Sequence, residues 1–141
     1  MKISRILYLI AIIFSSFPLL AQEEEDIPFA LIEKHPYYLK TDTLTGETKE
    51  IPFKYFLDRW VTKNLQYPEE ALEKKIEGRV IVTLRIDKEG FLSIKEVKGR
   101  NPLLEEVCRI FDGFPQLSPA LLRGKPVNVA YNYPVIFRII Q

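Results

Sequence analysis

The sequence has very little of the chemistry on which most enzymes and metal proteins depend. It contains one cysteine, Cys108, and one histidine, His35, among 141 residues. A single cysteine excludes a disulfide within the chain, although an oxidising compartment would permit one. One histidine and one cysteine also give too few nitrogen and sulfur ligands for a transition-metal site. Since no nucleophile, base and orienting carboxylate are grouped, we expect no catalytic residues, no cofactor and no metal ion.

An excess of charge of one sign is also lacking. The formal net charge is +1, from 20 basic and 19 acidic residues, and no basic stripe alternates with aromatic residues. Phosphate binding needs clustered Lys and Arg, so we expect no nucleic-acid partner. Nothing in the sequence indicates a small-molecule substrate. A hydrophobic share of 47% is ordinary for a globular protein.

Long hydrophobic runs are absent except for one segment at the N-terminus. Lys2 and Arg5 precede the apolar run "ILYLIAIIF", and "FPLLAQ" then offers a small residue, Ala21. This pattern is typical of a secretory signal peptide over residues 1–21, and it predicts a periplasmic mature chain. The alternative is an inner-membrane anchor. However, Ile6 to Ala21 is 16 residues, whereas a spanning helix needs about 20.

The next segment, residues 22–52, is expected to be an acidic leader, a short strand and an exposed loop. "QEEED" forms the leader, and "PFALI" at residues 28–32 has strand-forming content. Residues 41–50 are polar with one glycine, which predicts a loop or a hairpin tip. We expect the folded domain proper to cover residues 53–141.

Helical spacing begins at Phe53 and gives an amphipathic helix that ends before "NLQYP". Pro68 suits the first turn of a second, short helix. An alternating strand then runs from Val80 to Ile86, and "DKEG" predicts a hairpin turn in which Gly90 takes a positive φ.

A further helix is predicted in "NPLLEEVCRIFDG", with Cys108 on the apolar face and therefore in the core. "FPQLSPALLRGKP" should be an irregular connection. The closing strand is expected to place alternate residues from Val127 to Ile139 on one face. Pro134 cannot donate to a sheet ladder, so this strand should lie at an edge.

These motifs together resemble the C-terminal domain of TonB. "NLQYPEEALEKKIEGRVIVTLRIDKEGFLSIKEV" contains the family's Tyr-Pro, an alanine three residues later, a glycine before an alternating strand, and a hydrophobic-Asp-x-x-Gly hairpin. "NPLLEEVCRIF" and "FPQLSPALLRGKPVNVAYNYPVIF" are similar to its second helix, its Pro-x-x-x-Pro-Ala connection and its closing strand. Leu117 departs from the pattern, since the family usually has tryptophan there.

The resemblance implies a two-layer α+β fold, with helices on one face of a small antiparallel sheet. About three main strands and a possible N-terminal strand are expected. It also implies a partner, a short peptide of a TonB-dependent outer-membrane transporter that adds as a strand to the closing strand. The implied partner-binding residues are Asn64, Gln66, Tyr67, Asn128, Val129, Ala130, Asn132 and Val135.

An alternative remains open, because one exposed edge strand serves more than one kind of partner. The same edge can pair with a second copy of the chain, giving a homodimeric structural or adaptor protein without a transport role. Under either alternative, we expect proline at Val129 or Val135 to abolish pairing while the monomer still folds.

Overall fold

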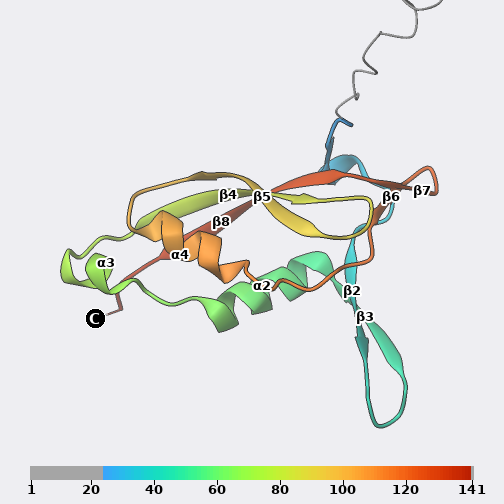
Figure 1. Cartoon of the computed structure of the whole chain (residues 1–141), viewed down its shortest axis with the longest axis horizontal. Coiled ribbons are helices and arrows are strands. Elements are labelled where there is room, and N and C mark those ends of the chain that lie inside the picture. The colour runs from blue at the N-terminus through green and yellow to red at the C-terminus, as the bar shows by residue number, and fades with distance from the viewer. Residues whose placement is uncertain (1–23, 141) are drawn as a thin grey trace, which may run out of the picture.

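The computed structural model describes residues 24–140, so the predicted signal peptide at residues 1–21 lies outside the described residues. The elements are β1 (Ile27–Pro28), the 3-10 helix η1 (Phe29–Leu31), β2 (Tyr37–Thr41), β3 (Thr48–Pro52), α2 (Phe53–Asn64), α3 (Glu69–Glu73), β4 (Gly78–Ile86), β5 (Leu92–Lys98), α4 (Leu103–Ile110), β6 (Ala120–Leu122), β7 (Lys125–Val127) and β8 (Val129–Phe137). Figure 1 shows the long strands in one layer, the helices α2 and α4 on one side of it, and the β2–β3 hairpin projecting from the body.

The main sheet has four strands in the order β1-β8-β4-β5. β4 pairs antiparallel with both β5 and β8, whereas β1 pairs parallel with β8. The predicted α+β class is therefore confirmed, whereas the sheet expected to be antiparallel carries one short parallel strand, β1. The strand expected at residues 28–32 is wrong in extent, because β1 ends at Pro28 and η1 follows. Pro28 has no N–H to continue the ladder.

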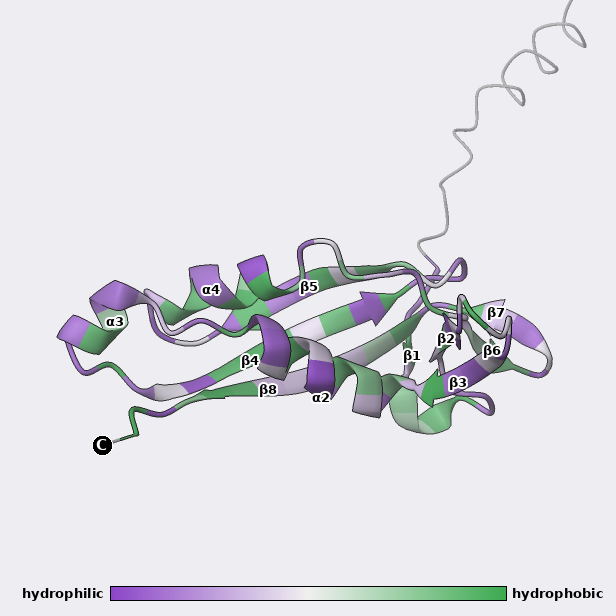
Figure 2. Ribbon diagram, turned by 90° about the horizontal axis from the view of Figure 1, so that it is seen from below, coloured by the Kyte–Doolittle hydropathy of each residue, from purple (hydrophilic) through white to green (hydrophobic). Residues whose placement is uncertain are grey.

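The core lies between the sheet and the helices. Figure 2 shows hydrophobic stretches along β4 and β8, and α2 and α4 lie alongside these two strands. The alternation predicted for β4 is realised, since Val80, Val82, Leu84 and Ile86 are all buried. The helical spacing after residue 53 is confirmed as well, because Phe53, Leu57 and Val61 form the buried side of α2.

The prediction that Cys108 lies in the core is wrong. Leu103, Glu106, Val107 and Ile110 are the buried residues, and Cys108 is exposed. Residues at i, i+4 and i+7 share a helix side, so Leu103, Val107 and Ile110 form a continuous stripe toward the sheet. Cys108 follows Val107 by about 100° around the axis and therefore faces away from this stripe. Its thiol is on the surface.

The connection before the closing strand is a second small hairpin, not an irregular segment. β6 and β7 pair antiparallel, and Arg123 and Gly124 between them have φ of 52° and 73°. Two successive positive φ values give the tight turn that matches the twist of a two-residue hairpin. Val127 therefore belongs to β7, and the closing strand β8 is shorter than predicted, running from Val129 to Phe137.

Candidate functional site: the outer edge of strand β8

The outer edge of β8 is open along most of its length. On its inner side, β8 pairs with β4 over its full extent, from Val129 to Phe137. On its outer side, β1 covers Val129 and Ala130 alone. Among residues 24–140, no strand pairs with the outer side of residues 131–137. Such an edge presents unpaired backbone donors and acceptors, which form a template for another strand.

The direction of the backbone groups along β8 follows from two hydrogen bonds. The Ile27 N–H donates to the Asn128 carbonyl at 2.9 Å, so the backbone groups of even-numbered residues in this segment point outward, away from β4. The Asp87 N–H donates to the Phe91 carbonyl at 3.0 Å. The backbone N–H and C=O groups of odd-numbered β4 residues therefore point toward β5, and those of even-numbered residues point toward β8. These even-numbered residues pair with the odd-numbered residues of β8.

Asn132, Pro134 and Ile136 therefore direct their backbone groups at the open edge. Because the backbone of Pro134 points outward, its missing N–H leaves the β4–β8 ladder intact. This explains how β8, which lies between β1 and β4 in the sheet, tolerates a proline. The open edge offers the N–H groups of Asn132 and Ile136 and the carbonyls of all three residues. On the open face of the sheet, the Asn132 side-chain oxygen accepts a hydrogen bond from Thr83 at 2.9 Å.

One end of this edge is occupied by the chain's own leader. Asn128 is buried, and its side chain accepts from the Lys88 N–H at 3.1 Å and donates to Glu24 at 3.4 Å. Asp26 forms ion pairs with Arg85, at 2.7 Å, and with Lys95. β1 and its acidic flank are thus fixed on the sheet at the start of β8.

The segment between α2 and α3 lies at the other end of the edge. Tyr67 packs edge-on against Phe137, the last residue of β8, with ring centroids 5.5 Å apart. The Gln66 N–H donates to Glu106 at 2.8 Å, and the Asn64 carbonyl accepts from Arg109 at 2.6 Å. Burial by itself would raise the pKa of Glu106, but hydrogen bonds from Arg109 and Gln66 outweigh it and hold that pKa below its usual range.

Helix α2 supports the helix-facing side of β8. The Tyr133 hydroxyl donates to Asp58 at 2.6 Å, and the Lys54 ammonium lies 5.6 Å from the Tyr131 ring centroid. Burial and the hydrogen bond to Asp58 raise the pKa of Tyr133 far above its usual range, so this phenol stays a neutral donor. These tyrosines are therefore structural supports of the strand.

The residues expected to bind a partner do not form one cluster in the structure. Asn64, Gln66 and Tyr67 lie at the end of β8, whereas Asn128, Val129 and Ala130 lie at its start, about 26 Å away, since eight steps of ~3.3 Å separate the first and last residues of the strand. Asn132 lies between them at the open edge. Val129 and Val135 are buried in the core, and as odd-numbered residues they direct their backbone groups toward β4.

Two features of this edge were missing from the sequence analysis. The parallel pairing of Ile27 and Pro28 with β8 has no local signal, because it joins segments about 100 residues apart. The outward direction of Ile136 was not identified either. Its signal is its even-numbered spacing from Pro134, which the sequence does display.

The described part of the chain shows no features of a metal centre or a membrane span. Residues 24–140 hold no group of three His, Cys, Asp or Glu side chains placed to bind a metal ion. Within the same residues, no helix has both the length and the apolar character to cross a bilayer. The site consists of backbone groups and polar side chains along one strand.

This fold and its open edge define a small α+β domain with an exposed sheet edge. Comparison with known families identifies it further: the sequence pattern of the Gram-negative bacterial TonB protein C-terminal matches residues 63–139. The match covers more than half of the chain, which therefore belongs to the TonB C-terminal family. No curated protein sequence matches the chain.

The family gives the broad setting of the function. Its members are periplasmic, non-enzymatic protein-interaction domains of Gram-negative bacteria, and they interact with TonB-dependent outer-membrane transporters. A protein-binding role in the cell envelope, linked to transport, follows from this membership.

Proposed function

We propose that this protein captures an extended peptide of a TonB-dependent outer-membrane transporter, or of another envelope protein, by strand addition to β8. The observation that carries this proposal is the outward set of unpaired backbone groups at Asn132, Pro134 and Ile136. Strand addition needs such groups and no side-chain catalyst. The edge already accepts one strand, since β1 pairs with its first two residues.

The polar residues at the two ends of the edge define the track of the added peptide. The peptide runs along residues 131–137 and reaches the segment of Asn64, Gln66 and Tyr67 where β8 ends. Asn132 supplies a donor and an acceptor in the middle of the track. Asn128, Val129 and Ala130 mark the start, where β1 limits the length open to a partner. Val135 acts from the core, by holding β8 on β4.

The decisive variant is Ile136→Pro, because it removes an outward N–H and leaves the β4–β8 ladder intact. The Ile136 side chain is half exposed, so the change costs little core packing. Proline at Val129 or Val135, the variants suggested by the sequence, would instead remove an N–H that faces β4 and damage the fold. Ile136→Val keeps the N–H and is the matched control.

Binding is measured by calorimetry with synthetic peptides that cover the N-terminal periplasmic segments of TonB-dependent transporters. We expect Ile136→Pro to weaken binding at least tenfold, which corresponds to about 1.4 kcal/mol. Ile136→Val should bind as the wild type does. A folded Ile136→Pro protein that binds equally well would exclude the β8 edge as the site.

The same edge also permits pairing between two copies of the chain, and sedimentation distinguishes the two uses. A monomer at high protein concentration that binds the transporter peptides supports peptide capture. A dimer that dissociates in Ile136→Pro, with no peptide binding in the wild type, supports the homodimer.

Cleavage of residues 1–21 belongs to this proposal as well, since a released chain acts as a free periplasmic binding module. The intact mass of the protein from its native envelope tests it. A chain that starts at Gln22 in the soluble periplasm agrees with the proposal. A chain that retains residues 1–21 in the inner membrane contradicts it and supports an anchored protein.

A further inference from the structure

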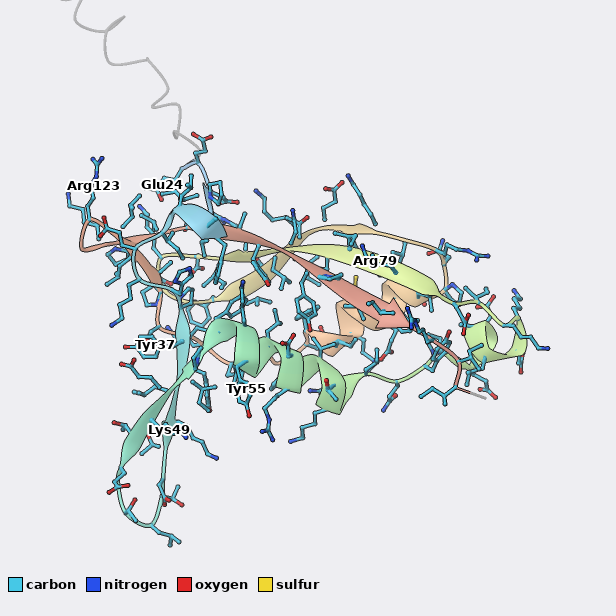
Figure 3. All side chains as sticks on the ribbon, turned by 180° about the vertical axis from the view of Figure 1, so that it is seen from behind. Glu24, Tyr37, Lys49, Tyr55, Arg79 and Arg123 are labelled. Atoms are coloured by element: carbon cyan, nitrogen blue, oxygen red, sulfur yellow. The ribbon has the colours of Figure 1, made fainter. Side chains whose placement is uncertain are left out.

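The β2–β3 hairpin is attached at its base, where the Tyr37 carbonyl accepts from the Ser118 N–H at 2.8 Å, and it is exposed over residues 39–50. It lies outside the family match, which begins at residue 63, and it projects away from the sheet (Figures 1 and 3). Its turn is well defined, because the Asp42 carboxylate accepts from the Leu44 N–H at 2.8 Å and the Asp42 carbonyl accepts from the Gly46 N–H at 2.8 Å. Two-stranded hairpins are marginally stable by themselves in water, so the exposed tip depends on the packed base, and its projection calls for an explanation.

The hairpin and α2 enclose an open groove of about 1470 Å³. Aromatic rings form its floor: Tyr38 stacks on Phe56 with centroids 4.3 Å apart, and Phe56 stacks on Trp60 at 6.2 Å. The Trp60 indole N–H donates to the Ile110 carbonyl at 2.8 Å, which fixes the ring. Figure 3 shows Lys49 on the projecting hairpin and Tyr55 at the neighbouring start of α2. The floor is therefore aromatic, with the Trp60 ring held in place by its hydrogen bond.

The charges around this floor are predominantly basic. Lys40 and Lys49 are direct cross-strand partners, and both line the groove. Arg59 and Lys63 line it from α2. Two acidic residues, Glu50 and Asp58, also line the groove, and Asp58 is engaged by the Tyr133 hydroxyl. Among residues 24–140, none of the four basic groups forms an ion pair with a carboxylate.

A directly opposed Lys–Lys pair destabilises a hairpin. Here the pair lies at the mouth of an aromatic groove, with two further cations on the opposite wall. A bound carboxylate between Lys40 and Lys49 would relieve their repulsion, and an apolar side chain next to it would cover the rings. An acidic segment in the groove would therefore explain why repelling cations lie next to half-buried aromatic rings.

We propose that the groove between the β2–β3 hairpin and α2 binds an acidic, extended segment of a second protein. Its carboxylates contact Lys40 and Lys49 on one wall and Lys63 on the other, and its apolar or aromatic side chains stack on Tyr38 and Phe56. A protein segment fits better than a membrane surface, because the rings lie inside a concave groove that a flat bilayer does not enter. This surface is separate from the β8 edge, and the proposal does not depend on the proposed function.

The probe is a fluorescein-labelled octapeptide of alternating glutamate and tyrosine, with the lysine–tyrosine octapeptide as its charge-reversed counterpart. Fluorescence anisotropy is measured on the full chain at low and at physiological salt. We expect saturable binding of the acidic probe that weakens with salt, and no binding of the basic one. Lys40→Glu/Lys49→Glu should weaken binding at least tenfold, and Lys49→Glu by itself should weaken it severalfold.

Lys74→Glu/Lys98→Glu is the matched control, since it makes the same change in net charge on exposed side chains outside the groove. It should bind the probe within twofold of the wild type. An equal loss in both double variants would reduce the interaction to general charge attraction and overturn the proposal. Vesicles of phosphatidylglycerol that bind through Lys40 and Lys49, with no binding of the peptide, would overturn it in favour of a membrane surface.

Loss of folding can be distinguished from loss of probe binding in this test. Lys49→Glu places a glutamate opposite Lys40, so the hairpin should become more stable while it loses the probe. Its unfolding temperature should therefore equal or exceed that of the wild type. The outcome is also distinct from that for Ile136→Pro, which should leave the acidic probe bound.

Discussion

At the scale of the residue, Glu106 is the side chain that fixes the segment leading into Tyr67. It is 9% exposed and accepts hydrogen bonds from the Gln66 N–H and from two nitrogens of Arg109, at 2.6 and 2.9 Å. A buried carboxylate is stable when it is paired in this way, because its donors replace the water it lost. Glu106 therefore links α4 to the end of the β8 edge.

Replacement of Glu106 by glutamine should lower the free energy of unfolding by about 1.5–3 kcal/mol at pH 7, the range for hydrogen bonds to a charged group. Since the folded pKa of Glu106 is lowered, its contribution is fully present above the unfolded value of about 4.3 and is lost as the pH falls through the lower folded value. The difference between variant and wild type should therefore shrink between pH 5 and pH 3.

Urea unfolding at pH 7 and pH 3.5 measures this difference. Glu105→Gln is the control, because Glu105 is exposed one position earlier on the same helix. A difference that stays the same at both pH values would show that the ionised form of Glu106 contributes nothing specific.

At the scale of the element, the β4–β5 hairpin depends on Gly90. Gly90 has φ of 90°, and a Cβ built there would lie 1.7 Å from the Leu117 carbonyl oxygen. The Gly90 carbonyl also accepts from the Leu117 N–H at 2.9 Å. Thus the turn is a docking point for the connection between α4 and β6, as well as the end of a hairpin.

Gly90→Ala should destabilise the protein by at least about 2 kcal/mol, since it adds a backbone clash to the strain of a positive φ. Gly113→Ala is the control: Gly113 has φ of 71° and open space around it, so that variant carries strain alone, about 1 kcal/mol. Thermal unfolding compares the two. Equal losses would mean that the contact with Leu117 yields without cost.

At the scale of the whole molecule, the acidic leader is fixed to one end of the β8 edge. The pairing of β1 with β8 and the ion pairs of Asp26 hold residues 24–28 across one end of the sheet. Burial by itself would raise the pKa of Asp26, but hydrogen bonds and charge from Lys95 and Arg85 outweigh it and lower that pKa. The attachment is therefore present above the unfolded pKa of about 4 and weakens as the pH falls through the lower folded value.

Asp26→Asn should loosen the leader, because it removes both ion pairs of a largely buried carboxylate. Hydrogen exchange of the Ile27 N–H, which donates to the Asn128 carbonyl, should accelerate at least tenfold. Glu25→Gln, next to it and exposed, should leave the exchange rate unchanged. Equal exchange rates in Asp26→Asn and the wild type would show that β1 is held by its backbone pairing alone.

Local patterns in the sequence determined much of this protein. The α+β class, the helix from Phe53, the β4–β5 hairpin and the position of Pro134 at an edge all follow from periodicity, turn residues and the missing proline N–H. These signals act over a few residues, so the sequence displays them directly. The resemblance to the TonB family rests on the same local motifs.

The tertiary structure decided what depends on distant partners. Cys108 lies outside the core because the side of α4 that carries Leu103 and Val107 faces the sheet. The helical period by itself does not determine which side of α4 faces the sheet. Likewise, the register of β8 against β4 and β1 determines that Asn132 and Ile136, and not Val129 and Val135, direct their N–H groups at the open edge. The two edges of a strand cannot be told apart from its local sequence. Only pairing with distant strands determines which edge stays open for a partner.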